Sequence, residues 1–173
     1  MTVLKAGPRI IGIAGWKNSG KTTLAERLIA ELTRRGKRIA SVKHAHHNFD
    51  IDRPGTDSAR HRAAGAREVA VVSDARIAHI RELIDEPEPS LADIVSKFAP
   101  CDLVIVEGYK TSAVAKIEVR RLESRSQAPL ADTDPYVIAI AADHDVQDQR
   151  LPVFRLDDVA SIAEFVLAWM ERT

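Results

Sequence analysis

The stretch Gly15-Trp16-Lys17-Asn18-Ser19-Gly20-Lys21-Thr22 decides the fold of this chain, because it matches the pattern G-x-x-x-x-G-K-[ST] in full. Directly before it, residues 9–14 form a short apolar run rich in β-branched residues, which suits a buried parallel strand. Directly after it, apolar residues recur at helical spacing over positions 24–32, and Gly36 is placed to end a helix. A strand, a glycine-rich loop and a helix in this order predict a phosphate-binding loop.

The residue types of this loop suit a nucleotide polyphosphate with Mg²⁺. Small residues let successive backbone N–H groups point at the phosphates, and the first turn of the helix adds its unpaired donors and its dipole. Lys21 is expected to reach the β- and γ-phosphates, the Thr22 hydroxyl to ligate Mg²⁺, and Thr23 to touch the α-phosphate. The predicted phosphate-binding residues are Gly15, Asn18, Ser19, Gly20, Lys21, Thr22 and Thr23.

Strand-like and helix-like segments alternate over the rest of the chain. Strands are expected at 37–42, 68–72, 103–106, 116–120, 137–142 and 151–155, and helices at 58–64, 91–98 and after residue 158. The alternation in 116–120 indicates a half-exposed strand at a sheet edge. The whole pattern predicts an α/β fold, a three-layer sandwich on a mostly parallel sheet of the P-loop NTPase type.

Length and charge narrow the class of protein further. The 173 residues predict one nucleotide-binding domain over 1–173, at roughly 100–200 residues per domain. The charges of the 25 basic and 25 acidic residues cancel, so the chain has no net positive charge that would indicate nucleic acid as a main ligand. The longest apolar run, 137–142, is about a third of a membrane span. With one cysteine, Cys101, no internal disulfide can form, and we expect a cytoplasmic protein without a membrane or nucleic-acid partner.

A second carboxylate is expected beside the loop, at the end of a neighbouring strand, where it can hold the Mg²⁺ shell. Glu107 follows the apolar residues 103–106 directly. We therefore predict Lys21 and Glu107 as the catalytic residues, and Thr22 and Glu107 as metal ligands. Glutamate stands here where aspartate is commoner, which favours contact of Glu107 with Mg²⁺ through water over direct coordination.

Residues 43–52 gather three histidines and two aspartates after the second expected strand, at the edge where ligands bind in open α/β sheets. The segment could be a metal site, a base that positions water or an oxyanion-binding loop. His44 and Asp50 are its candidates for ligand contact, Asp50 as a further metal ligand. A site made of His44, His46 and His47 would need a bend in the chain.

The sequence does not define clearly which residues would recognise the nucleobase of the nucleotide. Neither an Asn-Lys-x-Asp nor a Thr-Lys-x-Asp motif occurs in the chain. Asp143 follows residues 137–142, where a carboxylate could accept hydrogen bonds from guanine N1–H and its amino group. A turn or helix-cap role for Asp143 is the alternative.

In combination, several segments resemble the MobB family of molybdopterin-guanine dinucleotide biosynthesis. These segments are residues 15–24, 42–47, 54–58, 60–62, 64–66, 106–110 and 116–119, within a match that runs to about Asp143. The resemblance implies a GTP-binding, weakly hydrolysing protein, a homodimer with an extended joint sheet that assists the guanylyltransferase MobA in attaching GMP to molybdopterin. It also implies that the site includes Lys43, His44, Asp57, Arg60, Glu107 and Lys110.

We therefore interpret the sequence as that of a Mg²⁺-dependent accessory protein that hydrolyses GTP slowly. Its expected partners are GTP, molybdopterin or its guanine dinucleotide, a MobA-like guanylyltransferase and a second copy of the chain. One alternative is a non-catalytic adaptor that presents a nucleotide or pterin to a partner. Two others are a metal-insertion GTPase, which lacks its usual Cys-x-x-Cys or long histidine tract here, and a small-molecule kinase with residues 120–125 as its lid.

Overall fold

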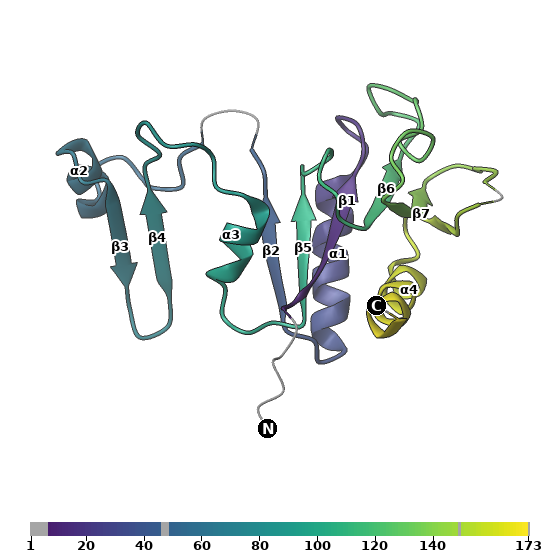
Figure 1. Ribbon diagram of the computed structural model, residues 1–173, viewed down its shortest axis with the longest axis horizontal. Coiled ribbons are helices and arrows are strands. Elements are labelled where there is room, and N and C mark those ends of the chain that lie inside the picture. The colour runs from purple at the N-terminus through teal and green to yellow at the C-terminus, as the bar shows by residue number, and fades with distance from the viewer. Residues whose placement is uncertain (1–6, 46–48, 149, 173) are drawn as a thin grey trace. The chain divides into compact units, whose positions relative to one another are not determined.

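A computed structural model of the chain describes residues 7–45, 49–148 and 150–172, which form two compact units (Figure 1). The first unit comprises Met1–His44 and Phe98–Thr173, and the second comprises Ala45–Lys97. His46 and His47 of the predicted histidine cluster lie outside the described residues. The single domain expected over 1–173 stays a prediction.

The first unit is built on a six-stranded parallel sheet with the strand order β2-β5-β1-β6-β7-β8. Its strands are β1 (Arg9–Ala14), β2 (Ile39–Lys43), β5 (Leu103–Glu107), β6 (Lys116–Arg120), β7 (Val137–Ala142) and β8 (Val153–Arg155). Its helices are α1 (Lys21–Arg34) and α4 (Val159–Arg172). The expected α/β fold on a mostly parallel sheet is confirmed, and β1 leads from the middle of the sheet into the glycine-rich loop that begins at Gly15.

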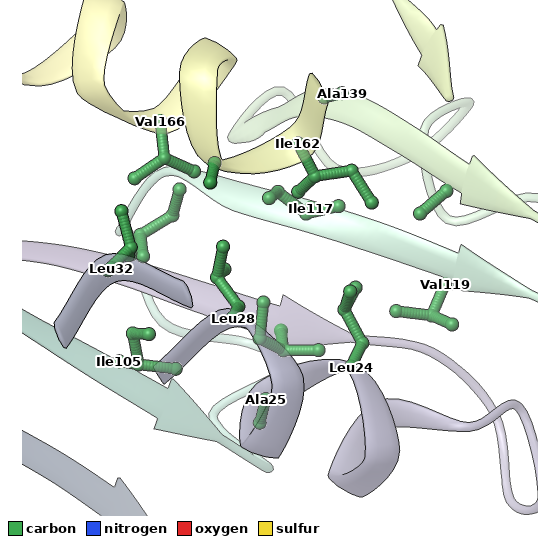
Figure 2. Packing of buried hydrophobic residues seen from close by; sticks show 14 of the residues in the cluster. Leu24, Ala25, Leu28, Leu32, Ile105, Ile117, Val119, Ala139, Ile162 and Val166 are labelled. Atoms are coloured by element: carbon green, nitrogen blue, oxygen red, sulfur yellow. The ribbon is translucent and has the colours of Figure 1, made fainter. Parts of the chain in front are cut away.

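The core of this unit lies between the sheet and helices α1 and α4 (Figure 2). Leu24, Leu28 and Leu32, which recur on one face of α1, are at most 1% exposed. They pack in one cluster with side chains of β5 and β6 and with residues of α4. Full burial of a leucine side chain contributes about 1.5–3 kcal/mol, so this stripe fixes α1 and the loop before it on the sheet.

Strand β6 corrects one expectation from the sequence. It is an interior strand paired with β1 and β7, and its polar residues Lys116 and Glu118 are each 1% exposed. The interpretation of residues 116–120 as a half-exposed edge strand is therefore wrong. Lys116 Nζ lies 2.7 Å from Asp134 Oδ2, and a Glu118 oxygen lies 2.8 Å from Arg120 Nη2. Alternating polar residues here mark buried ion pairs, which the pattern alone does not distinguish from solvent exposure.

The second unit contains α2 (Asp57–Ala63), β3 (Glu68–Val72), β4 (Ile77–Arg81) and α3 (Leu91–Ser96). Thr56 caps α2, and Ser90 with Asp93 forms a capping box before α3. β3 and β4 pair as an antiparallel hairpin. The strand β4 was not predicted from the sequence. Among the helices that the structure describes, none is long and apolar enough to cross a membrane.

Candidate functional site

The loop between β1 and α1 brings its predicted residues to the start of the helix. Gly20 is the residue before α1 and has a φ of +88°, a left-handed conformation that favours glycine. Lys21 is the first residue of α1, and its Nζ donates to the carbonyl oxygen of Trp16 at 2.7 Å. The ammonium group thus lies across the loop, where a bound phosphate would meet it.

Gly15 and Ser19 explain why the loop needs small residues. A Cβ on Gly15 would come within 2.6 Å of the carbonyl oxygen of Val119 and would also collide with the Ser19 hydroxyl. Ser19 is fully buried, and its hydroxyl has no hydrogen-bond partner among the described residues. Any side chain at position 15 would therefore push the loop away from β6.

Thr22 and Glu107 meet as the sequence predicts. Thr22 Oγ1 donates to Glu107 Oε1 at 2.8 Å, and Lys43 Nζ lies 3.7 Å from the same oxygen. The contact forms because β5, which ends at Glu107, is the direct neighbour of β1 in the sheet. A hydroxyl beside a carboxylate is a pair of hard oxygen ligands of the kind that Mg²⁺ takes, so these residues fit the expected ion.

Positive charge gathers around this pair. Burial lowers the pKa of Lys21 below its ordinary value; the charges of Lys110 and Lys43 lower it further, while Glu107 partly offsets them. Burial also lowers the pKa of Lys110, with Glu118 opposing the shift. A lysine in such surroundings becomes more stable as a cation when an anion arrives, so the arrangement favours a polyanionic ligand.

Contacts of Trp16 and its neighbour Lys17 connect the loop between β1 and α1 to distant parts of the first unit. Lys110 Nζ lies 3.1 Å from the centroid of the Trp16 ring, and Trp16 Nε1 donates to the carbonyl oxygen of Ala128 at 2.7 Å. The backbone N–H of Arg125 also donates to the carbonyl oxygen of Lys17 at 3.0 Å. The prediction from the sequence included Lys110 but not Trp16. Trp16 occupies a variable position of the motif, which does not indicate a role in the site.

Two adjoining cavities open at the loop. The larger, about 460 Å³, is lined by residues that include Asn18, Lys21, Thr22 and Glu123. The smaller, about 260 Å³, is lined by residues that include Leu24, Asp143 and Leu156. Gly20, Thr23 and Arg121 line both. Asp143 thus lies next to the phosphate loop, as its candidate role in base recognition requires.

Arg121 is a site residue that the sequence reading considered only as part of a kinase lid. Its position after β6, the strand beside β1, was the available signal, because side chains at the carboxyl ends of neighbouring parallel strands meet at one edge.

His44 and Tyr109 flank Glu107. The backbone N–H of His44 donates to the Glu107 carbonyl oxygen at 2.8 Å. The centroid of the His44 ring lies 5.1 Å from that of the Tyr109 ring. A Cβ on Gly108, which has a φ of +94°, would come within 2.8 Å of the His44 carbonyl oxygen, so glycine allows the two chains to approach.

The remaining candidates lie in the second unit. Asp50 accepts hydrogen bonds from Arg62 Nη1 at 2.9 Å and from the backbone N–H of Asp52 at 3.0 Å. Asp57 and Arg60 form an exposed pair 3.8 Å apart on α2. Their roles at the phosphate loop stay predictions. Over residues 7–45, 49–148 and 150–172, no three His, Cys, Asp or Glu side chains are grouped so as to hold a metal ion.

The parallel sheet with its Gly15–Thr22 loop between β1 and α1 defines an α/β protein of the P-loop type. The chain belongs to the family described as molybdopterin guanine dinucleotide synthesis protein B, whose model matches residues 10–143. This family is the one that the sequence segments resemble.

Relatives and solved structures agree with this membership. The molybdopterin-guanine dinucleotide biosynthesis adapter protein of Escherichia coli (strain K12) is 36% identical over 165 residues, 94% of each chain. Its namesake from Haemophilus influenzae is 37% identical over 93% of this chain and 89% of the relative. A crystal structure of molybdopterin-guanine biosynthesis protein B (mobB) has a TM-score of 0.72 at 30% identity, covering 94% of this chain and 99% of that one. These likenesses support a role as an adapter protein in molybdopterin guanine dinucleotide biosynthesis.

Proposed function

We propose that the protein binds GTP with Mg²⁺ at the Gly15–Thr22 loop, hydrolyses it slowly, and assists a guanylyltransferase that attaches GMP to molybdopterin. The observation that carries this proposal is the 2.8 Å contact between the Thr22 hydroxyl and the Glu107 carboxylate, beside Lys21. The expected metal ligand Thr22 and the expected phosphate-binding Lys21, both on α1, come together with the carboxylate that ends β5.

Each group has a part in phosphate chemistry. The loop amides and the Lys21 ammonium bind the β- and γ-phosphate oxygens, and Thr22 and Glu107 hold Mg²⁺, which withdraws charge from those oxygens when bound. Lys21 then stabilises the negative charge that develops as water attacks the γ-phosphate in line. Of the charged side chains gathered here, the three lysines only donate, and Glu107 is already engaged by Thr22 and Lys43. A strong base for water is therefore missing from this group, so we expect slow turnover.

The smaller cavity is proposed to hold the guanine base. It adjoins Thr23, the expected α-phosphate contact, and combines the apolar Leu156 with the Asp143 carboxylate and with the charged Arg27, Arg155 and Asp157. Apolar side chains suit the faces of a purine, and a carboxylate suits the N1–H and amino group of guanine.

A non-catalytic adaptor that binds GTP and presents it to the transferase is the second candidate function. It is favoured by the relatives, which are named adapter proteins. Titration of the full chain with GTP and ATP, with and without Mg²⁺, tests the binding that both candidates share. Tighter binding of GTP than of ATP, strengthened by Mg²⁺, is expected. Absence of GTP binding would contradict both candidates, and equal affinities would contradict the guanine site.

GTP hydrolysis by the wild-type chain, and its decrease in Glu107→Gln, separates the enzyme from the non-catalytic adaptor. If the carboxylate holds Mg²⁺ in the transition state, the variant should hydrolyse GTP at least about tenfold more slowly, a barrier increase of roughly 1.4 kcal/mol. GTP affinity should change less, because the loop amides and Lys21 supply most ground-state contacts. Single-turnover hydrolysis in saturating Mg²⁺ provides the measurement. An unchanged rate in Glu107→Gln would mean that the carboxylate has only a structural role.

We also propose that the protein is a cytoplasmic homodimer. Because β6 lies inside the sheet, it gives no exposed edge at which a second copy could pair. The dimer is supported instead by the β3–β4 hairpin, where Val71, Val72 and Ile77 are 49%, 66% and 72% exposed. An isolated two-stranded hairpin is marginally stable in water, and a second copy could cover its apolar side chains. Sedimentation at micromolar concentration should give twice the 19.1 kDa chain mass, and Val72→Lys with Ile77→Lys should shift it to the monomer. A wild-type monomer at this concentration would contradict the dimer.

A further inference from the structure

Arg121 lies where the two cavities meet. It is the first residue after β6, and its Cδ would be 3.0 Å from a Cβ placed on Gly20, so its aliphatic stem packs against the glycine that precedes α1. The side chain lines both the larger cavity, with Lys21 and Thr22, and the smaller one, with Asp143. A nucleotide that fills both cavities must therefore pass beside this guanidinium group.

The guanidinium group is shared between two carboxylates. Arg121 Nη2 lies 3.2 Å from Glu123 Oε2, and Arg121 Nε lies 3.4 Å from Asp143 Oδ2. Both distances exceed the 2.7–2.9 Å usual for charge-assisted hydrogen bonds. The Glu123 side chain is 77% exposed, so its ion pair is weak. A phosphate accepts two hydrogen bonds from a guanidinium group and can replace Glu123 there.

Asp143 is held more firmly than Glu123. Its Oδ1 accepts hydrogen bonds from the backbone N–H of Leu122 at 3.1 Å and from His144 Nδ1 at 2.8 Å. Burial would raise the pKa of Asp143, but the hydrogen bonds from His144, Leu122 and Arg121 outweigh it and keep the pKa below its ordinary value. The carboxylate therefore stays charged at neutral pH and keeps its place in the smaller cavity.

We propose that Arg121 couples phosphate binding to base selection: its Nη atoms bind a phosphate of the nucleotide in place of Glu123, while its Nε stays on Asp143 and orients that carboxylate toward guanine. This inference rests on the proposed GTP binding. It adds Arg121 as a nucleotide contact, Glu123 as the group that competes with the phosphate, and a physical link between the two cavities.

Affinities of GTP and ATP for the full chain and four variants test this inference. Arg121→Ala should weaken GTP binding at least about tenfold and should also lower the preference for GTP over ATP. Arg121→Lys should recover part of the affinity but not the preference, because a lysine ammonium cannot bridge two partners in fixed geometry. Glu123→Gln should tighten GTP binding a few-fold, since the competing charge is removed, with the preference unchanged.

Arg125→Ala is the matched control. Arg125 is an exposed arginine four residues further along the same segment, and it is not among the residues that line either cavity. The variant removes the same charge and should change GTP affinity less than about threefold. Thermal unfolding of each variant checks that it is folded, and Arg121→Lys keeps the test available if Arg121→Ala unfolds.

Three results would overturn the inference. Equal losses of GTP and ATP affinity in Arg121→Ala would show a charge effect without coupling to the base. Unchanged GTP affinity in that variant would remove the phosphate contact. An equal loss in Arg125→Ala would show a general field effect. If the wild-type chain binds no GTP in the same titration, the proposed function itself fails and the inference fails with it, which is a distinguishable outcome.

Discussion

Lys21→Ala is expected to lower the affinity for Mg²⁺–GTP at least about a hundredfold. Removing one partner of a buried, hydrogen-bonded charge pair costs roughly 2–5 kcal/mol, and 2.8 kcal/mol corresponds to a hundredfold change in the dissociation constant. The effect should be large because Lys21 lies across the mouth of the loop and is partly desolvated before the phosphate arrives. Isothermal titration of the variant with GTP in Mg²⁺ gives the affinity directly.

Lys17→Ala is the control for this prediction. Lys17 is an exposed lysine of the same loop, so the variant loses the same charge from the same segment but none of the proposed phosphate contact. Its GTP affinity should stay within about threefold of the wild type. The fold of Lys21→Ala should be retained, because within the described residues the ammonium group donates only to the Trp16 carbonyl oxygen. A folded Lys21→Ala protein that binds GTP normally would disprove the assignment of the phosphate-binding loop.

Glu118→Ala is expected to lower the free energy of unfolding by about 3–5 kcal/mol, the cost of breaking a buried ion pair by removing one partner. Glu118 is 1% exposed, and its oxygens accept hydrogen bonds from Arg120 and from the backbone N–H groups of Leu130 and Ala131. The alanine variant leaves all three donors without this acceptor, two of them on the segment that follows β6. Urea unfolding of variant and wild type measures the difference.

Glu164→Ala is the comparison for Glu118→Ala. Glu164 has a side chain that is 72% exposed and lies 3.9 Å from Arg35, so its loss should change the free energy of unfolding by no more than about 0.5 kcal/mol. If Glu118→Ala were as stable as Glu164→Ala, the network around Glu118 would contribute little to the fold. The segment from Arg121 to Leu130 would then need another anchor to hold Arg121 at the cavities.

The sequence predicted the elements that depend on local order. β1 spans Arg9–Ala14 as expected, α1 follows the loop, and Glu107 ends a strand beside it. These features follow from consecutive residues: a β-branched run, a glycine-rich motif, a helical stripe and a carboxylate at the end of an apolar strand. Family resemblance added Lys43 and Lys110, and the structure brings both to the loop.

The errors and omissions have a common origin. β4 was missed because Ile77-Ala78-His79-Ile80-Arg81 does not alternate strictly between apolar and polar residues, and its pairing with β3 defines it. Residues 116–120 were assigned to a sheet edge because polar alternation usually indicates solvent on one face. In the folded chain that face is buried, since Asp134 reaches Lys116 and the backbone of Leu130 reaches Glu118.

By itself, then, the sequence determined the strand, loop and helix that we propose to bind phosphate, because their geometry is encoded in neighbouring residues and their backbone hydrogen bonds. Only the tertiary structure decided which distant side chains complete the site. Trp16 meets Ala128 across a sequence separation of 112 residues, and Arg121 reaches Gly20 from the segment that follows β6. Such contacts depend on how parallel strands are ordered and how the segments between them fold back, and no local pattern carries that information.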